Sequence, residues 1–574
     1  MFFAANKANH GCNQIVQCFT ERTQKSLSLN ARSMRRSFNH HPEKQSIVKR
    51  LATKNAAFAN DGYENEQGNR MGPVLKERNG ANNRFQNVKR DKRNARDEDY
   101  LYTLRGLRKS SKRFDSAEDI SRQYERSGSL TNAQKAGMPF VKLQAGKANM
   151  FMDGNPIVYG GAIEERGGAG EDIKDGDAVG VFDHNMRPIA WGVWNGQSMF
   201  KVRVLELGKE IDGAILVKRV IKKRIEEAKA LRDVLGITSE HSGTNAYRLI
   251  NSEGDRLSGM IIDKYGSDNH FVVSASASWV EKHRKDVIDA LREVFLVTKK
   301  EDGNDDGKTM TVVWRRDVDM YALEGVDVTG EKTSVYDKNG NEVEHKGDDL
   351  KDEIEILENG VKYMVNLVDG HKTGFYVDQR ENRKFLGKLA AAAAVNNNDF
   401  SVLDLCTYTG GFAINAALNK CTKVTAVDSS KIVLKIAERN AELNKVSDKI
   451  KFVASDAFDF LDDCIERGEQ FDVVVCDPPK FAPTVKSLEK SLSKYIGLNS
   501  RALRCVKPGG VLISCSCSGA ITQRKLLPSI VYEAAQAANR RVAKIQESSA
   551  GGDQPIDPSF PEGEYLSVLA VRVM

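Results

Sequence analysis

The sequence predicts an α/β protein whose C-terminal part is a doubly wound, mostly parallel sheet, preceded by a small β-barrel and a central α+β unit. Strand and helix patterns alternate over about 170 residues from Ser401 onward, which is typical of such a sheet. Short apolar runs separated by turns fill about 70 residues from Pro139, as in a small barrel. The stretch between them mixes both patterns. We therefore place the domains at residues 139–207, 208–350 and 351–574.

The first unit is predicted from a hairpin and one further strand. Val179–Phe182 and Ile189–Trp194 are apolar runs that flank a polar turn closed by Pro188. Apolar and charged residues alternate over 202–207, as in a strand with one buried face.

The central unit is predicted to hold a long amphipathic helix at 212–235 and another near 279–296. Its strand candidates are the apolar runs at 249–250, 260–262, 271–273 and 311–314. The polar residues 299–308 and 335–352 are expected to be loops. A hairpin at 354–368 follows, because Asn359-Gly360 is a preferred pair for a two-residue hairpin turn.

The C-terminal unit is expected to alternate strands with helices. The strand candidates are 401–405, 423–427, 450–453, 471–476, 510–516 and 564–573. The helix candidates are 410–419, 430–444, 457–467, 485–505 and 521–538. Ligands of such sheets bind outside the carboxyl ends of the strands, so the residues that follow each strand are candidate site residues.

Charge and composition exclude several classes of protein. The net charge of +7 is uneven: residues 1–135 hold 27 Lys and Arg against 14 Asp and Glu, and the other 439 hold 59 against 65. An RNA site in the body of the protein would therefore be a local patch. The sequence contains no apolar run of about 18 residues, so no membrane span is expected. The nine cysteines are mostly isolated, which favours a reduced, intracellular protein.

The N-terminal stretch is basic. Residues 1–60 contain ten Lys and Arg but only Glu21 and Glu43 as acids, a composition typical of an organelle transit peptide. Arg36-Ser37-Phe38 favours a mitochondrion over a plastid; a disordered basic tail on a cytoplasmic protein is the alternative. Residues 61–138 are expected to be a disordered basic linker.

The first three strand ends predict a nucleoside site. Leu403–Phe412 contains a Gly-Gly turn but no G-x-G-x-x-G fingerprint, so no pyrophosphate site is implied. Asp428, at the end of the second strand, can accept both hydroxyls of a ribose. Ser455–Phe458 suits an adenine ring, and Asp404 would lie near an amino-acid portion. A ribose acid and an adenine site without a phosphate site indicate S-adenosyl-L-methionine as the cofactor; ordinary loop caps are the alternative. The predicted cofactor-binding residues on this sheet are Asp404, Tyr408, Thr409, Gly410, Gly411, Asp428, Ser429, Asp456, Ala457 and Asp477.

The last two strand ends concern the methyl acceptor. Asp477-Pro478-Pro479 is followed by Lys480, where enzymes that methylate amines commonly have an aromatic residue, so the signal for N-methylation is weakened. A cysteine at the next strand end is unnecessary for an amine but needed for carbon, because a thiolate added to C6 of a pyrimidine makes C5 nucleophilic. Of the two candidates, Cys515 is expected to be a core residue and Cys517 the nucleophile. No second Cys/His pair has the spacing of a zinc site.

With these residues in hand, residues 139–574 resemble the bacterial 23S rRNA cytosine-C5 methyltransferase family that carries an N-terminal PUA domain. The stretches that carry the resemblance are His371–Arg380, Tyr408–Phe412, Asp477–Phe481, Ser516–Gly519 and Pro561–Leu566. The resemblance implies a Rossmann-like class I methyltransferase domain, a PUA-like barrel and a family-specific central domain. It also implies a loop over the cofactor that supplies Lys372, Thr373, Gly374 and Phe375.

The sequence departs from the family in places. Related two-cysteine enzymes carry a second cysteine where Lys480 stands here, so we expect a single-cysteine mechanism. Asp477 is then the candidate proton acceptor, or it only positions the base or the cofactor. Family members often have an aromatic residue at the place of Cys515.

These observations predict an S-adenosylmethionine-dependent methyltransferase that acts on C5 of a cytosine in large-subunit rRNA. The alternatives are N-methylation of an rRNA guanine and a non-catalytic RNA-binding assembly factor. RNA is the expected partner, no membrane is expected, and a homodimer is possible.

Overall fold

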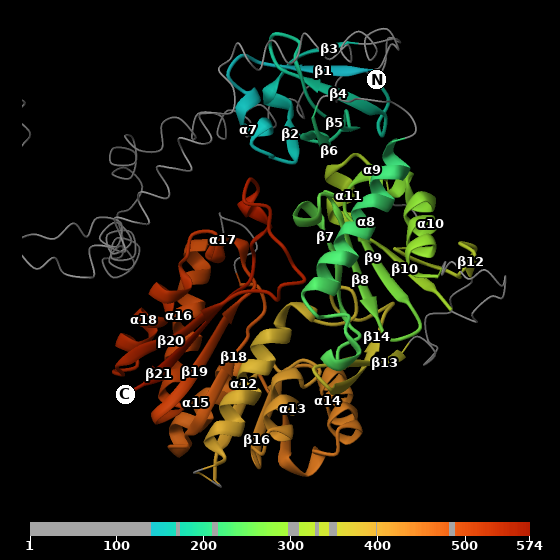
Figure 1. The fold of residues 1–574 in the computed structure, drawn as a ribbon. Helices are drawn as coiled ribbons and strands as arrows, with labels where there is room; N and C mark the ends of the chain where they lie inside the picture. The colour runs from blue at the N-terminus through green and yellow to red at the C-terminus, as the bar shows by residue number, and fades with distance from the viewer. Residues whose placement is uncertain are drawn as a thin grey trace, which may run out of the picture. The chain divides into compact units, whose positions relative to one another are not determined.

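The computed structural model describes residues 139–574 apart from 168–172, 209–215, 297–308, 328–331, 344–352, 396, 398 and 482–487. The predicted transit peptide at 1–60, the linker at 61–138 and the loop at 299–308 lie outside the described residues. No helix within the described ranges is long and apolar enough to cross a membrane. Within the same ranges the strands form four sheets (Figure 1).

The first sheet has six strands in the order β2-β6-β5-β4-β1-β3. The predicted hairpin is confirmed, because β4 and β5 pair antiparallel. Its turn is held by Asp183, whose Oδ1 accepts hydrogen bonds from the backbone N–H groups of Asn185 and Arg187, both at 2.8 Å. The elements are β1 (Phe140–Leu143), α7 (Ala148–Met152), β2 (Ile157–Tyr159), β3 (Ile163–Gly167), β4 (Ala178–Phe182), β5 (Pro188–Trp194) and β6 (Phe200–Leu207).

The second sheet has six strands in the order β12-β11-β10-β9-β8-β7, in which only β9 and β10 pair parallel. Helix α10 packs against α8. The elements are α8 (Leu216–Val234), β7 (Tyr247–Asn251), β8 (Met260–Tyr265), β9 (His270–Ala275), α9 (Ser278–Lys282), α10 (Arg284–Phe295), β10 (Thr311–Arg316), α11 (Val318–Leu323), β11 (Thr333–Tyr336) and β12 (Glu342–Val343).

Two predictions for this central unit are wrong in detail. The helix expected near 279–296 is divided at His283, whose backbone leaves helical geometry and whose Nδ1 lies 2.8 Å from Asp286 Oδ2. The loop expected at 335–352 contains the end of β11 and the whole of β12. Tyr336 is buried because β11 pairs with β10, a contact with a distant segment that local polarity does not reveal.

The hairpin at 354–368 is confirmed as β13 (Glu353–Glu358) and β14 (Val361–Asn366). Asn359 and Gly360 have φ angles of 51° and 82°. Positive φ at both central residues is the conformation that makes Asn-Gly favourable in a two-residue turn.

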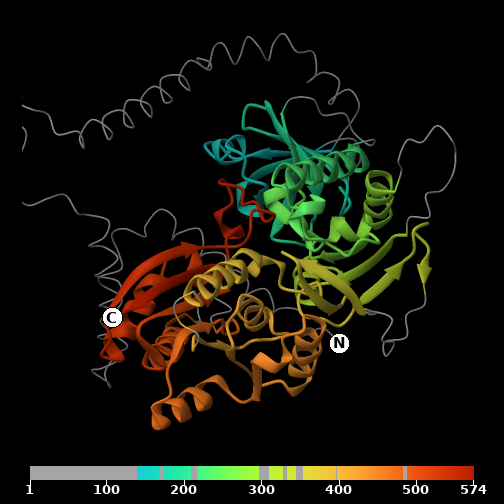
Figure 2. The same ribbon diagram turned by 60° about the horizontal axis from the view of Figure 1, so that its bottom comes forward.

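The C-terminal sheet has seven strands in the order β17-β16-β15-β18-β19-β21-β20, and β19, β20 and β21 lie side by side (Figures 1 and 2). The five strands β15 to β19 pair parallel with one another, whereas β21 pairs antiparallel with β19 and β20. Helix α12 packs against α13, and α16 packs against α15 and α18. The predicted doubly wound fold is therefore confirmed.

The elements of this unit are α12 (Arg380–Ala393), β15 (Ser401–Leu405), α13 (Gly411–Leu418), β16 (Lys423–Asp428), α14 (Lys431–Leu443), β17 (Ile450–Ala454), α15 (Ala457–Arg467), β18 (Phe471–Cys476), α16 (Leu488–Arg504), β19 (Val506–Ser516), α17 (Gly519–Thr522), α18 (Leu527–Ala537), β20 (Val542–Ser548) and β21 (Ser567–Val573). Sequence periodicity missed β20, because this edge strand is largely exposed and lacks an apolar run. The helix predicted at 521–538 is two helices, with Pro528 in the first turn of α18.

The strand order reverses between β15 and β18. From β15 the chain winds outward through β16 to β17, and it then returns to β18 and β19 on the other side. A crevice forms at such a reversal, outside the carboxyl ends of the central strands. All five predicted strand-end motifs meet at this edge of the sheet.

Candidate active site

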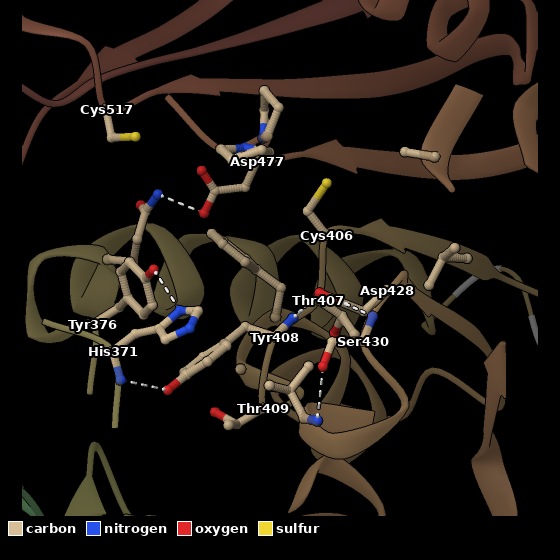
Figure 3. Close-up of a pocket in the computed structure, with 18 of the residues that line it drawn as sticks. His371, Tyr376, Cys406, Thr407, Tyr408, Thr409, Asp428, Ser430, Asp477 and Cys517 are labelled. Atoms are coloured by element: carbon tan, nitrogen blue, oxygen red, sulfur yellow. Dashed lines mark hydrogen bonds between the residues drawn. The ribbon is translucent and has the colours of Figure 1, made fainter. Parts of the chain in front are cut away.

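A pocket of about 420 Å³ lies at the carboxyl ends of the parallel strands. This volume is in the range of small-molecule and cofactor sites. Residues that follow β15, β16, β17, β18 and β19 line it, together with part of the segment 371–383 that precedes the sheet. Figure 3 shows Asp428 and Thr409 on one side of the pocket and Asp477 and Cys517 on the other.

The loop after β15 is held in an unusual backbone conformation. Cys406 and Tyr408 have φ angles of 60° and 52°, which non-glycine residues adopt infrequently. Gly410 has φ 86°, and a Cβ there would lie 3.1 Å from Ile414 Cδ1. The loop thus turns sharply into α13, and Tyr408, Thr409 and Gly411 line the pocket whereas Gly410 does not.

Asp404 lies beneath this loop and does not line the pocket, contrary to the expectation that it lies near the cofactor's amino-acid portion. Its Oδ2 accepts hydrogen bonds from Thr407 Oγ1 at 2.5 Å and from the Ala413 N–H at 3.0 Å. Burial raises the pKa of Asp404 to about 7. Since both partners belong to the turn into α13, Asp404 shapes the loop from below.

Asp428, the last residue of β16, is half-buried and lines the pocket with Ser429. Its Oδ2 accepts from the Tyr408 N–H at 3.0 Å and its Oδ1 from the Ser430 N–H at 3.0 Å (Figure 3). A carboxylate has about four acceptor positions, so each oxygen retains capacity for a ribose hydroxyl. The geometry fits the predicted role, and it also couples Asp428 to the loop after β15.

Asp456, after β17, caps α15. Its Oδ1 accepts hydrogen bonds from the backbone N–H groups of Phe458 at 2.8 Å and Asp459 at 3.4 Å. Asp456, Ala457 and Phe458 line the pocket, so the residues predicted to bind the adenine lie in its wall at the start of this helix.

Asp477 and Cys517 leave the sheet at the same edge, because Cys476 of β18 pairs with Ser514 of β19. Both line the pocket. Burial raises the pKa of Asp477 to about 6, and the negative charge of Asp378 adds to the shift. Burial also raises the pKa of the Cys517 thiol, and the charge of Asp477 acts in the same direction. The pocket therefore contains a thiol whose pKa is raised and a carboxyl group whose pKa is about 6.

The neighbouring cysteines differ in position. Cys515 and Cys476 are fully buried and do not line the pocket, in agreement with the core role predicted for Cys515. Lys480 is exposed and also lies outside the lining, whereas Phe481 contributes to it. Cys406 lines the pocket, but burial raises the pKa of its thiol.

The segment 371–375 divides between two surroundings. Lys372 and Phe375 line the pocket, but Thr373 and Gly374, both predicted to bind cofactor, do not. Thr373 is 2% exposed, and its Oγ1 lies 2.5 Å from Asp263 Oδ2 and 2.8 Å from the Tyr265 hydroxyl. Thr373 thus anchors the segment to β8, because its hydroxyl finds both partners there.

Several lining residues were not among the predicted site residues. His371 stacks on Tyr408 with ring centroids 5.0 Å apart, and the Tyr376 hydroxyl lies 3.4 Å from His371 Nδ1 (Figure 3). Asp378 accepts a hydrogen bond from the Tyr565 hydroxyl at 2.8 Å and pairs with Lys372. Gln379 donates to Asp477. The only sequence signal for His371, Tyr376, Asp378 and Gln379 was their position within the stretch His371–Arg380. That stretch alone does not indicate which of its side chains face the pocket.

The comparisons with known proteins agree with this architecture. Residues 396–557 match the methyltransferase domain family and residues 141–207 the PUA-like domain family. The chain is 32% identical to the ribosomal RNA large subunit methyltransferase I of Klebsiella pneumoniae over 444 residues, which cover 76% of this chain and 98% of the relative. It is 33% identical to the protein of that name from Escherichia coli over 435 residues, 75% of this chain and 98% of the relative.

Solved structures show the same fold. A structure described as "a putative sam-dependent methyltransferase" from Streptococcus mutans is 19% identical, with a TM-score of 0.56 over 75% of this chain and 99% of its own. A methyltransferase structure solved with SAH also has a TM-score of 0.56, at 20% identity over 75% of this chain and 99% of its own.

The predicted organelle location is wrong by these comparisons. The similar curated proteins are bacterial rRNA methyltransferases, and bacteria contain neither mitochondria nor plastids. The prediction was based on the composition of residues 1–60 alone, which a basic tail shares with a targeting segment.

Proposed function

The chain belongs to the family of ribosomal RNA large subunit methyltransferases I, and from this premise we propose that it methylates C5 of a cytosine in large-subunit rRNA through a transient bond between Cys517 and C6 of the base. S-Adenosylmethionine is its cofactor. The observation that carries the proposal is a half-buried cysteine, Cys517, that lines the cofactor-type pocket together with Asp477. A methyl transfer to an amine would need no cysteine there.

The residues present fit the cofactor. Asp428 retains acceptor capacity for the ribose hydroxyls, and the start of α15 offers Asp456 and Phe458 to the adenine. Thr409 and Gly411, in the loop after β15, line the pocket and would hold the amino-acid portion through their backbone. When bound, the cofactor supplies an electrophilic methyl group to the side of the pocket that holds Asp477 and Cys517.

The chemistry needs a nucleophile and a base. The Cys517 thiol passes its proton to bulk water, and the thiolate forms the S–C6 bond while the C5=C6 electron pair makes C5 the nucleophile. After C5 has accepted the methyl group, Asp477 takes the C5 proton. The electron pair of the C5–H bond then re-forms C5=C6 and breaks the S–C6 bond, which releases the thiolate. Only one cysteine is required, which suits the absence of a cysteine at Lys480.

Asp477 is suited to accept this proton because its pKa is raised to about 6. A base is most effective when its pKa lies close to the working pH but leaves it ionised. An ordinary aspartate would be ionised but a weaker base. The raised pKa follows from burial, so it is a consequence of the pocket's depth.

The target cytosine can enter the pocket only if it leaves any stacked arrangement in the RNA. Phe481 lines the pocket and contacts Tyr495 edge-on at 5.0 Å between ring centroids, so Tyr495 holds an aromatic ring in the pocket that Asp477 also lines. The PUA-like domain at 141–207 would hold flanking RNA. A homodimer stays a prediction.

The test combines a product analysis with one substitution. We expect nucleosides from rRNA treated with the protein to contain 5-methylcytosine by mass spectrometry. Cys517→Ala should abolish methyl transfer. The dissociation constant for SAH should change by less than about threefold, because in the proposed mechanism the cysteine contacts the target cytosine and not the cofactor. Cys515→Ala is the matched control and should remain active, since Cys515 lies in the core.

Three results would overturn the proposal. Methylguanosine as the product would replace it with N-methylation. Absence of any transferred methyl group from a folded, cofactor-binding protein would favour an assembly factor. An active Cys517→Ala variant would exclude covalent catalysis by this residue.

A further inference from the structure

Gln379 contacts the carboxylate that the proposed mechanism uses as its base. It ends the short 3-10 turn Val377–Gln379 before α12, and its side chain is 3% exposed at the wall of the pocket. Its Nε2 donates a hydrogen bond to Asp477 Oδ2 at 3.0 Å. Among the described residues, Asp477 Oδ1 has no hydrogen-bond partner, so one oxygen is held and the other remains available.

The orientation of the Gln379 amide follows from its neighbours. Asn382, 1% exposed, faces the backbone carbonyl of Ser549 at 3.3 Å, and a carbonyl can only accept. The atom of Asn382 that faces it is therefore Nδ2, which also donates to Gln379 Oε1 at 2.7 Å. The remaining Oδ1 accepts from Ser548 Oγ at 2.8 Å.

This chain of amides has a fixed direction. Because Gln379 Oε1 is occupied by the Asn382 donor, its other end must be the NH₂ group, and that group faces Asp477. The network starts at the end of β20, passes through the first turn of α12 and ends on the carboxylate after β18. Three segments that are distant in sequence therefore cooperate to present one hydrogen-bond donor.

We propose that Gln379 is a positioning residue for the methyl transfer: it holds Asp477 Oδ2, and so directs Oδ1 toward the C5 proton of the cytosine adduct. This inference deepens the proposed function and rests on it. A donor amide stabilises the ionised carboxyl group, so this contact lowers the pKa of Asp477 against the larger effect of burial, which raises it. Gln379 thus keeps the base ionised at neutral pH as well as oriented.

Gln379→Leu removes the donor and keeps a similar volume. We expect the acidic limb of its kcat profile to move about one pH unit to higher pH, because the lost hydrogen bond no longer favours the carboxylate. At pH 7 the ionised fraction of Asp477 should fall from about nine-tenths to about one-half, so lost ionisation accounts for about a twofold fall in kcat, and a larger fall reports lost orientation. The dissociation constant for SAH should change less than about threefold, since the side-chain hydrogen bonds of Gln379 join it to Asp477 and Asn382 and not to Asp428 or Asp456.

The matched control is Gln470→Leu. Gln470 precedes β18 at the opposite end of the same strand and donates one hydrogen bond, to the Arg504 carbonyl at 3.0 Å. Its loss should leave the pH profile unchanged. Gln379→Glu serves as a second variant that keeps the shape of the side chain. Its carboxyl group can donate a hydrogen bond only while it is protonated. The activity of Gln379→Glu should therefore exceed that of Gln379→Leu at acidic pH, and this advantage should disappear at alkaline pH.

The outcomes separate this inference from the proposed function. If wild-type protein forms 5-methylcytosine and both variants keep the wild-type acidic limb, Gln379 does not position the base, and the inference is wrong while the function stands. If wild-type protein forms no 5-methylcytosine, the function fails and the inference with it. If Gln379→Leu unfolds in a thermal melt, the pH dependence of Gln379→Glu decides alone.

Discussion

Asp428 offers a sharp test of cofactor binding, because both of its oxygens already have backbone partners. In Asp428→Asn, an NH₂ group replaces one oxygen and must oppose the N–H of either Tyr408 or Ser430. One charge-assisted hydrogen bond to the ribose is also lost. A hydrogen bond to a charged group contributes about 1.5–3 kcal/mol, so we expect a total loss of about 3 kcal/mol in cofactor binding. At 1.4 kcal/mol per tenfold, the dissociation constant should rise roughly 100-fold.

The assay is isothermal titration calorimetry with SAH, accompanied by a thermal melt that reports folding. Asp448→Asn is the control, because Asp448 is exposed in the turn before β17, at the opposite edge of the sheet. It should bind SAH as wild type does. A folded Asp428→Asn variant whose dissociation constant lies within about threefold of wild type would refute the assignment of Asp428 to the ribose.

Two further predictions concern proton transfer and stability. Asp477 must be ionised to accept a proton, and its pKa is raised to about 6, so kcat should fall as the pH drops through about 6. An ordinary aspartate would sustain activity to about pH 4, so a wild-type profile that stays flat to pH 4 would contradict this role. Asp477→Asn should abolish turnover. Glu358 and Arg383 form a buried bidentate pair with hydrogen bonds of 2.6 and 2.5 Å, so Glu358→Gln should destabilise the fold by about 3 kcal/mol in chemical denaturation, because it leaves a buried guanidinium without its counter-charge. The exposed Glu442→Gln should change stability by less than about 0.5 kcal/mol, and equal effects of the two substitutions would contradict this reasoning.

The elements that sequence patterns predicted correctly share a local cause. The β13–β14 hairpin is encoded by Asn359-Gly360, because both residues tolerate positive φ. The parallel strands β15 and β18 are apolar runs, since helices cover both faces of the sheet. In contrast, β20 is exposed and β11 is ordered by pairing with β10, so neither has a local signal.

The candidate site divides in the same way. Asp428, Asp477 and Cys517 were identified because parallel strands bring their carboxyl ends to one edge, whatever the details of packing. The direction of each side chain was not predictable: Thr373 faces Asp263 and Tyr265 and not the pocket, and Asp404 supports the loop from below.

By itself, the amino-acid sequence determined the fold class, the family and the strand ends that carry the chemistry, because apolar periodicity and turn residues act over a few neighbouring positions. Only the tertiary structure decided which donor faces which carboxylate. Gln379 meets Asp477 across 98 residues of chain, and Asn382 meets Ser548 across 166. Such contacts depend on the packing of separate segments to within a hydrogen-bond length, and no local pattern encodes that distance.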